Sequence, residues 1–457
     1  MHKAIIPLLY VLIFSVSNLF AGNGSKPHYN DKDINHIVSQ LTLEQKARLL
    51  VGCPGSDKGV SHIVAGSAGY TFPIDSLDIP SINLADGPVG VRITPVLPNK
   101  PYTSYCTCFP STTALAATWN KDIARLEGNA IGDEALAYGV DIVLTPGINI
   151  MRNPLCGRNF EYFSEDPYLS GIMGAAMING IQDKGIGASL KHFIANNQQT
   201  GKLYNDARIS QRAIREIYLK GFEICIKNSD PWTVMGSYNK IGGQYTQANP
   251  ELLRTILRNE WNYNGLIVTD WYKKRDTADQ LNGGTDLMMP GEQSQVDEII
   301  AGVKNGRISE TTLNKSVKYV LKLISKSISN KGWEYNEAPD LAANAALARR
   351  IATEGMVLLK NDRSFLPISQ GAKIALFGAT AYKSIAGGTG SSNVNKAHIT
   401  DISTGLEKGG YTLSNRLKGL YTKFVEFQND LLDKHPESTD WEKLSYNRTV
   451  IAEMDLS

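Results

Sequence analysis

The feature that most constrains the fold of this chain is a repeated order of short apolar segments, polar residues and helical segments. The apolar, β-prone segments lie at 82–84, 141–144, 187–190, 233–236, 265–269 and 286–289. Helical patterns separate them, at 121–138, 165–184, 208–228, 250–262 and 293–305. Such alternation is typical of an α/β barrel or a doubly wound sheet, so we predict an α/β fold.

Polar or aromatic side chains follow most of these apolar segments, for example at Asp86, Lys191, Tyr238 and Asp270. In a barrel of parallel strands, the carboxyl ends of all strands face one side, and binding sites are built there. One polar residue at a strand end is often structural. Five or six such ends together are instead typical of a functional face.

Two units are expected along the chain. A helical pattern at 309–328 closes the first unit and 329–340 is a predicted linker, so we place a barrel at 30–335 and a second unit at 336–457. In the second unit we predict helices at 341–355 and 416–434, strands at 357–359 and 373–377, and a glycine-rich loop at 387–392. Two strands are few for an α/β layer, so we expect this domain to be incomplete.

The N-terminus has the pattern of an export signal. Lys3 precedes an apolar run from Ala4 to Phe20, and small residues follow at Ala21 and Gly22. We interpret residues 1–21 as a signal peptide, because the run is short for a membrane-spanning helix, which is the alternative. The expectation is an exported protein, periplasmic or secreted, without stable insertion in a membrane.

Composition and missing motifs narrow the function classes. The net charge is +2 and basic residues are scattered, which argues against nucleic acid or an anionic membrane surface as a partner. The seven histidines include no HExxH, and GxSxG and GxxxxGK[ST] are missing. The glycine-rich loop lacks the third glycine of GxGxxG. We therefore expect no metal and no cofactor. The five cysteines cannot all pair with one another, and any pairing stays open.

Asp270 is the candidate nucleophile among the residues at the strand ends. A carboxylate there can attack an anomeric carbon and form a covalent glycosyl-enzyme, although Asp is also common as a helix N-cap. A hydrogen bond from Tyr238 would keep such a carboxylate ionised.

Other residues suit the binding of a sugar. Lys191 and His192 are adjacent donors for vicinal hydroxyls, and His192 is also a possible base. Trp271 is a candidate aromatic platform. Further hydroxyl-binding or charge-setting groups are Asp86, Arg92 and Arg158. Each arginine could instead form a structural ion pair.

Taken together, these segments resemble glycoside hydrolase family 3, from about Leu41 to about Leu406. The matching pieces, in order, are LTLEQKARLL, NLADGPVGVR, CFPSTTALAATWN, GVDIVLTPGINIMRNPLCGRNFEYFSEDPYLSG, LKHFIANN, VMGSYNKI, GLIVTDW and EGMVLLKNDRSFLPI. The resemblance implies a (β/α)8 TIM-type barrel followed by an α/β sandwich. It also implies a retaining, exo-acting β-glucosidase whose partner is a β-glucoside or oligosaccharide.

The resemblance also assigns roles. Asp270 in VTDW would be the nucleophile, and Tyr238 in GSYN would hydrogen-bond to it. Asp86 would bind the outer hydroxyls of the sugar, with Arg92 nearby. The rest of the substrate pocket would consist of Arg158, Lys191, His192, Lys202, Met235, Trp271 and Ser391.

Two departures from the family stand out. Many relatives have arginine where this chain has Lys202, which keeps the charge but loses the planar fork. The acid/base glutamate of the family lies in a Gly-Glu-Gly context beyond the glycine-rich loop. That context is not found before Ser457 and does not surround Glu407, Glu426, Glu437, Glu442 or Glu453. We expect a C-terminally truncated chain that binds sugar and forms the covalent intermediate but turns over poorly.

Several alternatives remain open. The barrel could carry a non-catalytic or inactive sugar-binding site, which would not need an ionised Asp270 with Tyr238 beside it. A β-xylosidase or arabinofuranosidase of the same family is a further alternative. The N-acetylglucosaminidase branch is disfavoured, because the loop after Lys191-His192 lacks its Pro-Gly-His-Gly and Asp-x-His patterns.

Overall fold

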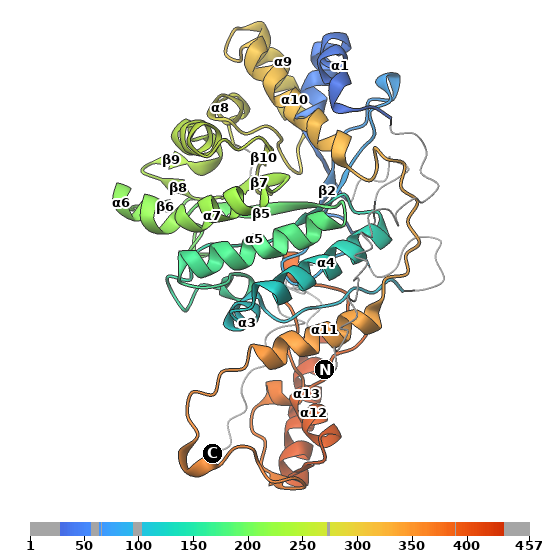
Figure 1. Cartoon of the computed structure of the whole chain (residues 1–457), viewed down its shortest axis with the longest axis vertical. Helices are drawn as coiled ribbons and strands as arrows, with labels where there is room; N and C mark the ends of the chain where they lie inside the picture. The colour runs from blue at the N-terminus through green and yellow to red at the C-terminus, as the bar shows by residue number, and fades with distance from the viewer. Residues whose placement is uncertain are drawn as a thin grey trace, which may run out of the picture.

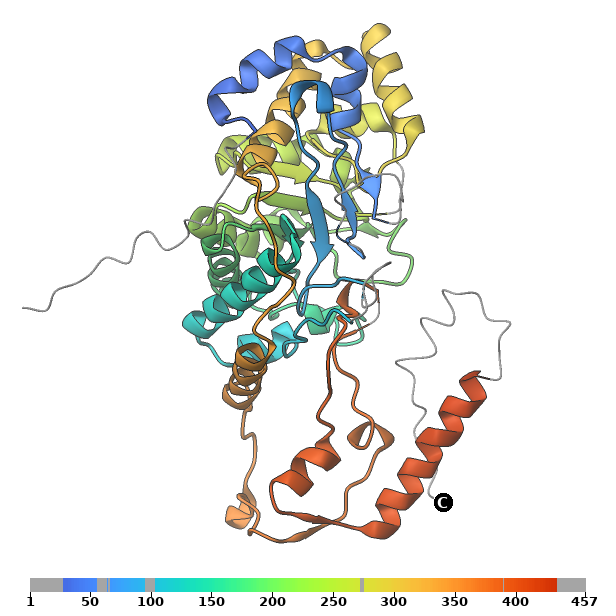
Figure 2. The ribbon, with the colours of Figure 1, turned by 90° about the vertical axis from the view of Figure 1, so that its right-hand side faces the viewer.

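The computed structural model describes residues 28–55, 64, 66–94, 103–271, 275–388 and 390–433. Two parts are visible in Figure 1: a sheet wrapped by helices at the top, and a smaller helical part in orange and red at the bottom. Figure 2 shows α11 (Leu341–Glu354) between these two parts. The predicted signal peptide at 1–21 lies outside the described residues.

A seven-stranded sheet forms the centre of the first part. Its strands in spatial order are β1 (Cys53–Pro54), β2 (Gly69–Tyr70), β3 (Asn83–Asp86), β4 (Ile142–Leu144), β5 (Gly187–Phe193), β7 (Thr233–Gly236) and β10 (Leu266–Val268). From β3 to β10 all neighbouring strands are parallel. Strand β2 is antiparallel to both β1 and β3.

Isolated bridges close this sheet into a barrel. Val268 of β10 pairs in parallel with Leu287, and Met288 pairs in parallel with Val51, just before β1. Segment 287–288 therefore occupies an eighth position beside the seven strands. The predicted (β/α)8-type barrel is confirmed, with one strand reversed and with no α-helix described between β1 and β3.

Side chains alternate between the two faces of the strands, as the period of a β-strand requires. Leu84, Ile142 and Val268 contribute to one buried apolar cluster, together with residues of α1 (Ile34–Gln40), α2 (Leu43–Leu49) and α10 (Glu310–Lys326). Ala85, Val143 and Ile267, their neighbours in sequence, belong to a second cluster beneath α4 and α5. Both faces of the strands are thus buried, which explains their continuous apolar sequences.

Helices form the outer layer of the barrel. The longer ones are α4 (Lys121–Tyr138), α5 (Pro167–Asp183), α7 (Lys220–Ser229), α9 (Gln293–Lys304) and α10. Helix α4 has the predicted bounds because Asn120 caps its first turn and Gly139, at φ 76°, ends it. The predicted helix at 208–228 is divided into α6 (Gln211–Ala213), a π-helical turn η4 (Ile214–Tyr218) and α7. The predicted helix at 250–262 is the π-helical η6 (Glu251–Glu260).

Helices α3 (Thr112–Ala117) and α8 (Thr277–Gly283) are among those that were not predicted from the sequence. They begin after Ser111 and Asp276. Each of these two side chains accepts a backbone hydrogen bond as an N-cap.

The second part has less strand structure than predicted. The predicted strand at 357–359 is wrong, because these residues pair with no strand in the described part of the chain, and Leu359 is 92% exposed. The predicted strand at 373–377 is shortened to β11 (Lys373–Ile374), which pairs in parallel with β12 (Thr412–Leu413). The remaining helices here are α12 (Ile402–Lys408) and α13 (Asn415–Asp433).

The glycine-rich loop of the second part docks on the barrel. The Cys106 N–H donates to Asn395 O at 2.8 Å, and Val394 is buried in the apolar core of the barrel. A side chain at Gly388 would collide with the Phe160 ring, so glycine is required for this close approach. Among the described residues, no helix is long and apolar enough to cross a membrane.

Candidate active site

Most of the predicted site residues come from five neighbouring parallel strands, β3, β4, β5, β7 and β10, and from the segments that follow them. Asp86 ends β3, Lys191 and His192 lie near the end of β5, and Tyr238 and Asp270 follow β7 and β10 by two residues. Because these strands are parallel and adjacent through β4, their carboxyl ends meet at one rim.

Asp270 lies at the centre of this group and is buried. Its Oδ1 accepts a hydrogen bond from the Trp271 backbone N–H at 2.8 Å. Its Oδ2 is buried and has no hydrogen-bond partner among the described residues. The His192 Nε2 lies 3.9 Å from Oδ2. One carboxylate oxygen is therefore oriented by the backbone, and the other is buried with its hydrogen-bonding capacity unused.

The protonation of Asp270 depends on opposing effects. Burial raises the pKa of Asp270, while Arg158, the Trp271 N–H, Lys191 and Tyr238 lower it. The pKa of Tyr238 is raised by burial and by the neighbouring Asp270 carboxylate, which a phenolate would repel. Tyr238 therefore stays protonated and remains a donor beside the carboxylate.

His192 is fixed by residues that we did not single out from the sequence. Asn149 accepts from the His192 backbone N–H at 3.0 Å and donates to the His192 carbonyl at 2.9 Å. The Tyr162 hydroxyl lies 3.4 Å from Nδ1. Burial, followed by the positive charges of Arg158, Lys191 and Lys202, holds the pKa of His192 well below its usual value. The imidazole is thus neutral and offers one donor and one acceptor.

Arg158 and Glu161 form a buried ion pair beside Lys191. Arg158 Nε donates to Glu161 Oε1, while Glu161 Oε2 is buried without a hydrogen-bond partner among the described residues. Burial lowers the pKa of Lys191, whereas Glu161 raises it. Glu161 was part of the motif GRNFE but was not predicted as a site residue. The only signal was its position in that motif.

Asp86 and Arg92 form a second pair at the rim. The Arg92 Nη1 donates to Asp86 Oδ2 at 3.2 Å, and the side chain of Arg92 is 40% exposed. The Arg92 backbone N–H also donates to Asp86 O at 2.8 Å, so the loop folds back on β3. Asp86 is therefore held toward Arg92 at the carboxyl end of β3.

The remaining predicted residues differ in their surroundings. Met235 is buried on β7, and Trp271 is buried with its Nε1 donating to Ala68 O at 2.9 Å. The Lys202 Nζ lies 5.0 Å from the centroid of the Tyr238 ring. Ser391 lies in the short helix η9 (Gly390–Ser392) and is half-buried. Its loop contacts Phe160, two residues from Arg158.

No metal centre is found in the described part of the chain, where no three His, Cys, Asp or Glu side chains gather as ligands. Cys106, Cys108, Cys156 and Cys225 are present as thiols. The donors around Asp270 are an amine, an imidazole, a guanidinium and a phenol, which suit the hydroxyl groups of a polar ligand.

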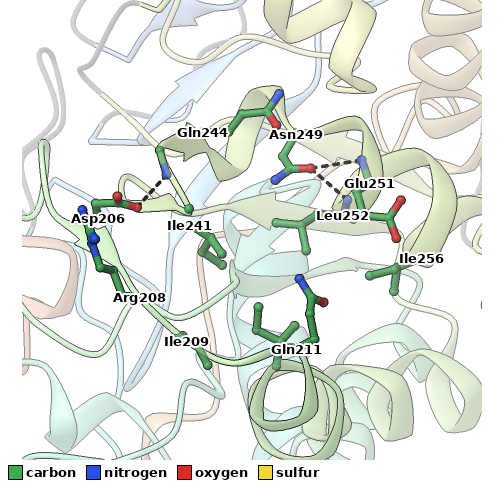
Figure 3. Close-up of a pocket in the computed structure, with 13 residues that line it drawn as sticks. Asp206, Arg208, Ile209, Gln211, Ile241, Gln244, Asn249, Glu251, Leu252 and Ile256 are labelled. Carbon is green, nitrogen blue, oxygen red and sulfur yellow. Dashed lines mark hydrogen bonds between the residues drawn. The ribbon is translucent and has the colours of Figure 1, made fainter.

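A separate hollow of about 660 Å³ lies beside the strands β6 (Asp206–Ala207), β8 (Lys240–Ile241) and β9 (Gln244–Tyr245). Figure 3 shows Asp206 and Arg208 on one side of this hollow and Ile256 on another. It contains none of the residues predicted for the sugar site.

The fold and the site define a (β/α)8-type barrel protein with a buried carboxylate among polar donors at the carboxyl ends of the strands. Residues 101–323 match the glycosyl hydrolase family 3 N-terminal domain. This part of the chain is therefore a glycoside hydrolase family 3 N-terminal domain.

Curated relatives and solved structures agree with this family. The chain is 40% identical to thermostable β-glucosidase B of Acetivibrio thermocellus over 410 residues, which cover 88% of this chain and 51% of that protein. It is 37% identical to an exo-α-(1→6)-L-arabinopyranosidase of Bifidobacterium longum, over 82% of this chain and 49% of that one. The structure of β-glucosidase 3B from Thermotoga neapolitana in complex with α-D-glucose matches with a TM-score of 0.84 at 42% identity, covering 87% of this chain and 57% of that one. The chain spans about half the length of the curated relatives it matches.

Proposed function

We propose that this chain carries the glycone site of a retaining, exo-acting β-glucosidase, which removes terminal non-reducing β-D-glucosyl residues through a covalent intermediate on Asp270. The observation that carries the proposal is the Asp270 carboxylate itself. Its Oδ1 is held by a backbone N–H, and its Oδ2 is buried without a hydrogen-bond partner among the described residues. A binding site alone does not need such a carboxylate. The relatives named above support the class of substrate.

In the proposed reaction, Asp270 Oδ2 attacks the anomeric carbon and the bond from that carbon to the aglycone oxygen breaks. The electron pair of the broken bond goes to the aglycone oxygen, which either takes up a proton or departs as an anion. Water then attacks the anomeric carbon of the glycosyl ester and loses a proton to solvent, while the bond from that carbon to Asp270 Oδ2 breaks and the carboxylate is restored. Two inversions give net retention.

The neighbouring side chains would bind and orient the sugar. Tyr238 would donate a hydrogen bond to the ionised Asp270 carboxylate. Neutral His192 and the Lys191 amine would bind hydroxyl groups from β5. Asp86, held by Arg92, would accept from the outer hydroxyls. Arg158, fixed by Glu161, and Lys202 would add charge-assisted hydrogen bonds. Met235, Trp271 and Ser391 would complete the wall of the pocket.

We also retain the proposed domain limits, with the barrel at 30–335 and a partial α/β sandwich at 336–457. A signal peptide at 1–21 and export to the periplasm or the medium belong to the same proposal. The pattern of Lys3 followed by an apolar run supports the export signal.

The sharpest test uses an aglycone that departs without a proton, because no glutamate of this sequence stands in a Gly-Glu-Gly context. The protein would be mixed with 2,4-dinitrophenyl β-D-glucoside, and dinitrophenolate release would be followed in the first turnover. We expect a burst of about one equivalent, and we expect none from the Asp270→Asn variant.

The corresponding β-D-xyloside and α-L-arabinopyranoside, which lack the primary hydroxymethyl group, should react more slowly if Asp86 and Arg92 bind the outer part of glucose. Faster release from either of them would favour the xylosidase or arabinosidase alternative instead. Calorimetric binding of glucose without any burst would contradict catalysis and favour the non-catalytic sugar-binding alternative.

A further inference from the structure

A group of cationic and aromatic side chains contacts the backbone of Tyr238 and lies outside the residues assigned to the sugar. The Arg275 guanidinium carbon lies 3.5 Å from the centroid of the Tyr245 ring, and the Lys240 Nζ lies 4.7 Å from the same centroid. We call Lys240, Tyr245 and Arg275 the cationic rim. Lys240 and Tyr245 come from the paired strands β8 and β9 that follow β7, and Arg275 comes from the segment after β10.

The cationic rim is joined directly to the site. Arg275 Nη2 donates to Tyr238 O at 3.3 Å and to Leu203 O at 2.8 Å. Leu203 follows Lys202, whose Nζ lies over the Tyr238 ring. The rim therefore contacts the segments that carry two proposed site residues, and Arg275 is only five residues beyond Asp270.

The order of the strands indicates on which side of the barrel mouth the cationic rim lies. In the ring of eight strand positions, β3 and β10 lie opposite each other. A sugar with its outer hydroxyls at Asp86 of β3 and its anomeric carbon at Asp270 would span the mouth of the barrel. The bond that breaks would then lie on the β10 side, where Arg275 is placed. A leaving group would meet the cationic rim first.

The rim has unused capacity for a negative charge. Both hydrogen bonds that Arg275 donates to described residues come from Nη2, so Nε and Nη1 keep their donors. Within the described residues, no salt bridge joins Lys240 or Arg275 to an acid. A guanidinium presents a planar fork of donors, which matches the two oxygens of a carboxylate.

We propose that Arg275, with Lys240 and Tyr245, forms an aglycone subsite that selects β-glucosides whose leaving group carries a carboxylate. The inference rests on the proposed function, since it assigns the part of the substrate beyond the glucosyl unit. The tyrosine ring would contact the apolar part of the aglycone, while the two cations would bind its acid group.

Arg208, next to the small sheet of β6, β8 and β9, offers a matched control for Arg275. Lys240 and Tyr245 are paired in register, and so are Ile241 and Gln244, whose side chains border the hollow in Figure 3. Arg208 also lines that hollow and is exposed. Removing Arg208 changes the net charge as much as removing Arg275 does, but leaves the cationic rim intact.

The test compares two chromogenic substrates, 4-carboxy-2-nitrophenyl β-D-glucoside and its methyl ester, which differ mainly in the charge of the aglycone. Release of the nitrophenol would be measured under single-turnover conditions, and kcat/KM would be compared as the ratio of acid to ester. We expect a ratio on the order of two- to ten-fold in favour of the acid at low salt, as for a partly exposed ion pair. The ratio should decrease as salt screens the charges.

Arg275→Met should bring the ratio close to that of the substrates in free solution, and Lys240→Met should lower it partly. Arg208→Met should leave it at the wild-type value. Equal rates for acid and ester in the wild-type protein, or the same loss in Arg208→Met as in Arg275→Met, would overturn the inference alone. No release from either substrate would overturn the proposed function and the inference with it.

Discussion

Glu127 is a buried carboxyl group without hydrogen-bond partners among the described residues, and we predict that it makes the stability of the fold depend on pH. It lies on the inner face of α4, fully buried, and neither of its oxygens has a hydrogen-bond partner among the described residues. Burial raises the pKa of Glu127 from 4.5 to about 8. The folded protein therefore keeps this proton at neutral pH, while the unfolded chain loses it above about pH 4.5.

The sign and size of the effect follow from proton linkage. Between the two pKa values the folded state binds one more proton than the unfolded state, so the free energy of unfolding falls as pH rises. The slope is about 1.4 kcal/mol per pH unit, and the loss between the two pKa values reaches roughly 5 kcal/mol. This stabilisation is complete below pH 4.5 and gone above about pH 8. A loss of that size is a large part of the stability of a typical domain.

The variant Glu127→Gln removes the titration and keeps the shape. Its buried amide has a cost that does not change with pH, so we predict that its stability relative to wild type increases steadily from pH 5 to 8. Urea unfolding, followed by tryptophan fluorescence at pH 5, 6, 7 and 8, would measure this difference. Glu310→Gln, at an exposed position of α10, is the control and should show no such trend. A constant difference between Glu127→Gln and wild type at all four pH values would refute the reasoning.

Three further predictions concern the site and the core. Arg158→Met should raise the pKa of Asp270, because Arg158 lowers it, and the acid limb of the glycosylation rate should move to higher pH; an unmoved limb in single-turnover pH profiles would contradict this. Tyr238→Phe should slow dinitrophenolate release by on the order of ten-fold or more, since a hydrogen bond to a charged group is lost, and an unchanged burst rate would be evidence against that contact. Arg258→Met should lower the free energy of unfolding by about 3–5 kcal/mol by leaving Asp286 buried without its partner, and a second change, Asp286→Asn, should restore part of it in urea melts.

The sequence predicted the barrel well where apolar segments are buried on both faces. Strands β4, β7 and β10 lie within the predicted ranges, because their alternate apolar residues are buried in the two apolar clusters. The sequence did not predict the reversed β2, which has two residues and is defined by its neighbours. Residues 357–359 are as apolar as a strand, but strand formation also needs a partner, and none pairs with them among the described residues.

The sequence indicated the polar side chains at the strand ends, but it did not indicate the residues that hold them in place. Asp270, Tyr238 and His192 stand at strand ends, where the motif and the position agree. Asn149 and Glu161 act through contacts between segments that are distant in the chain or folded back, and spacing alone does not reveal such contacts. The cationic rim was likewise hidden, because Tyr245 and Arg275 meet only in three dimensions.

The most direct test of the central claim is the mass of the intact protein after incubation with 2,4-dinitrophenyl 2-deoxy-2-fluoro-β-D-glucoside, which forms the glycosyl-enzyme but releases it slowly. The account predicts a mass increase of one fluoroglucosyl group, located by peptide mapping on Asp270 and missing in Asp270→Asn. An adduct on another residue, or an unmodified protein that still binds glucose, would contradict the assignment of Asp270 as the nucleophile.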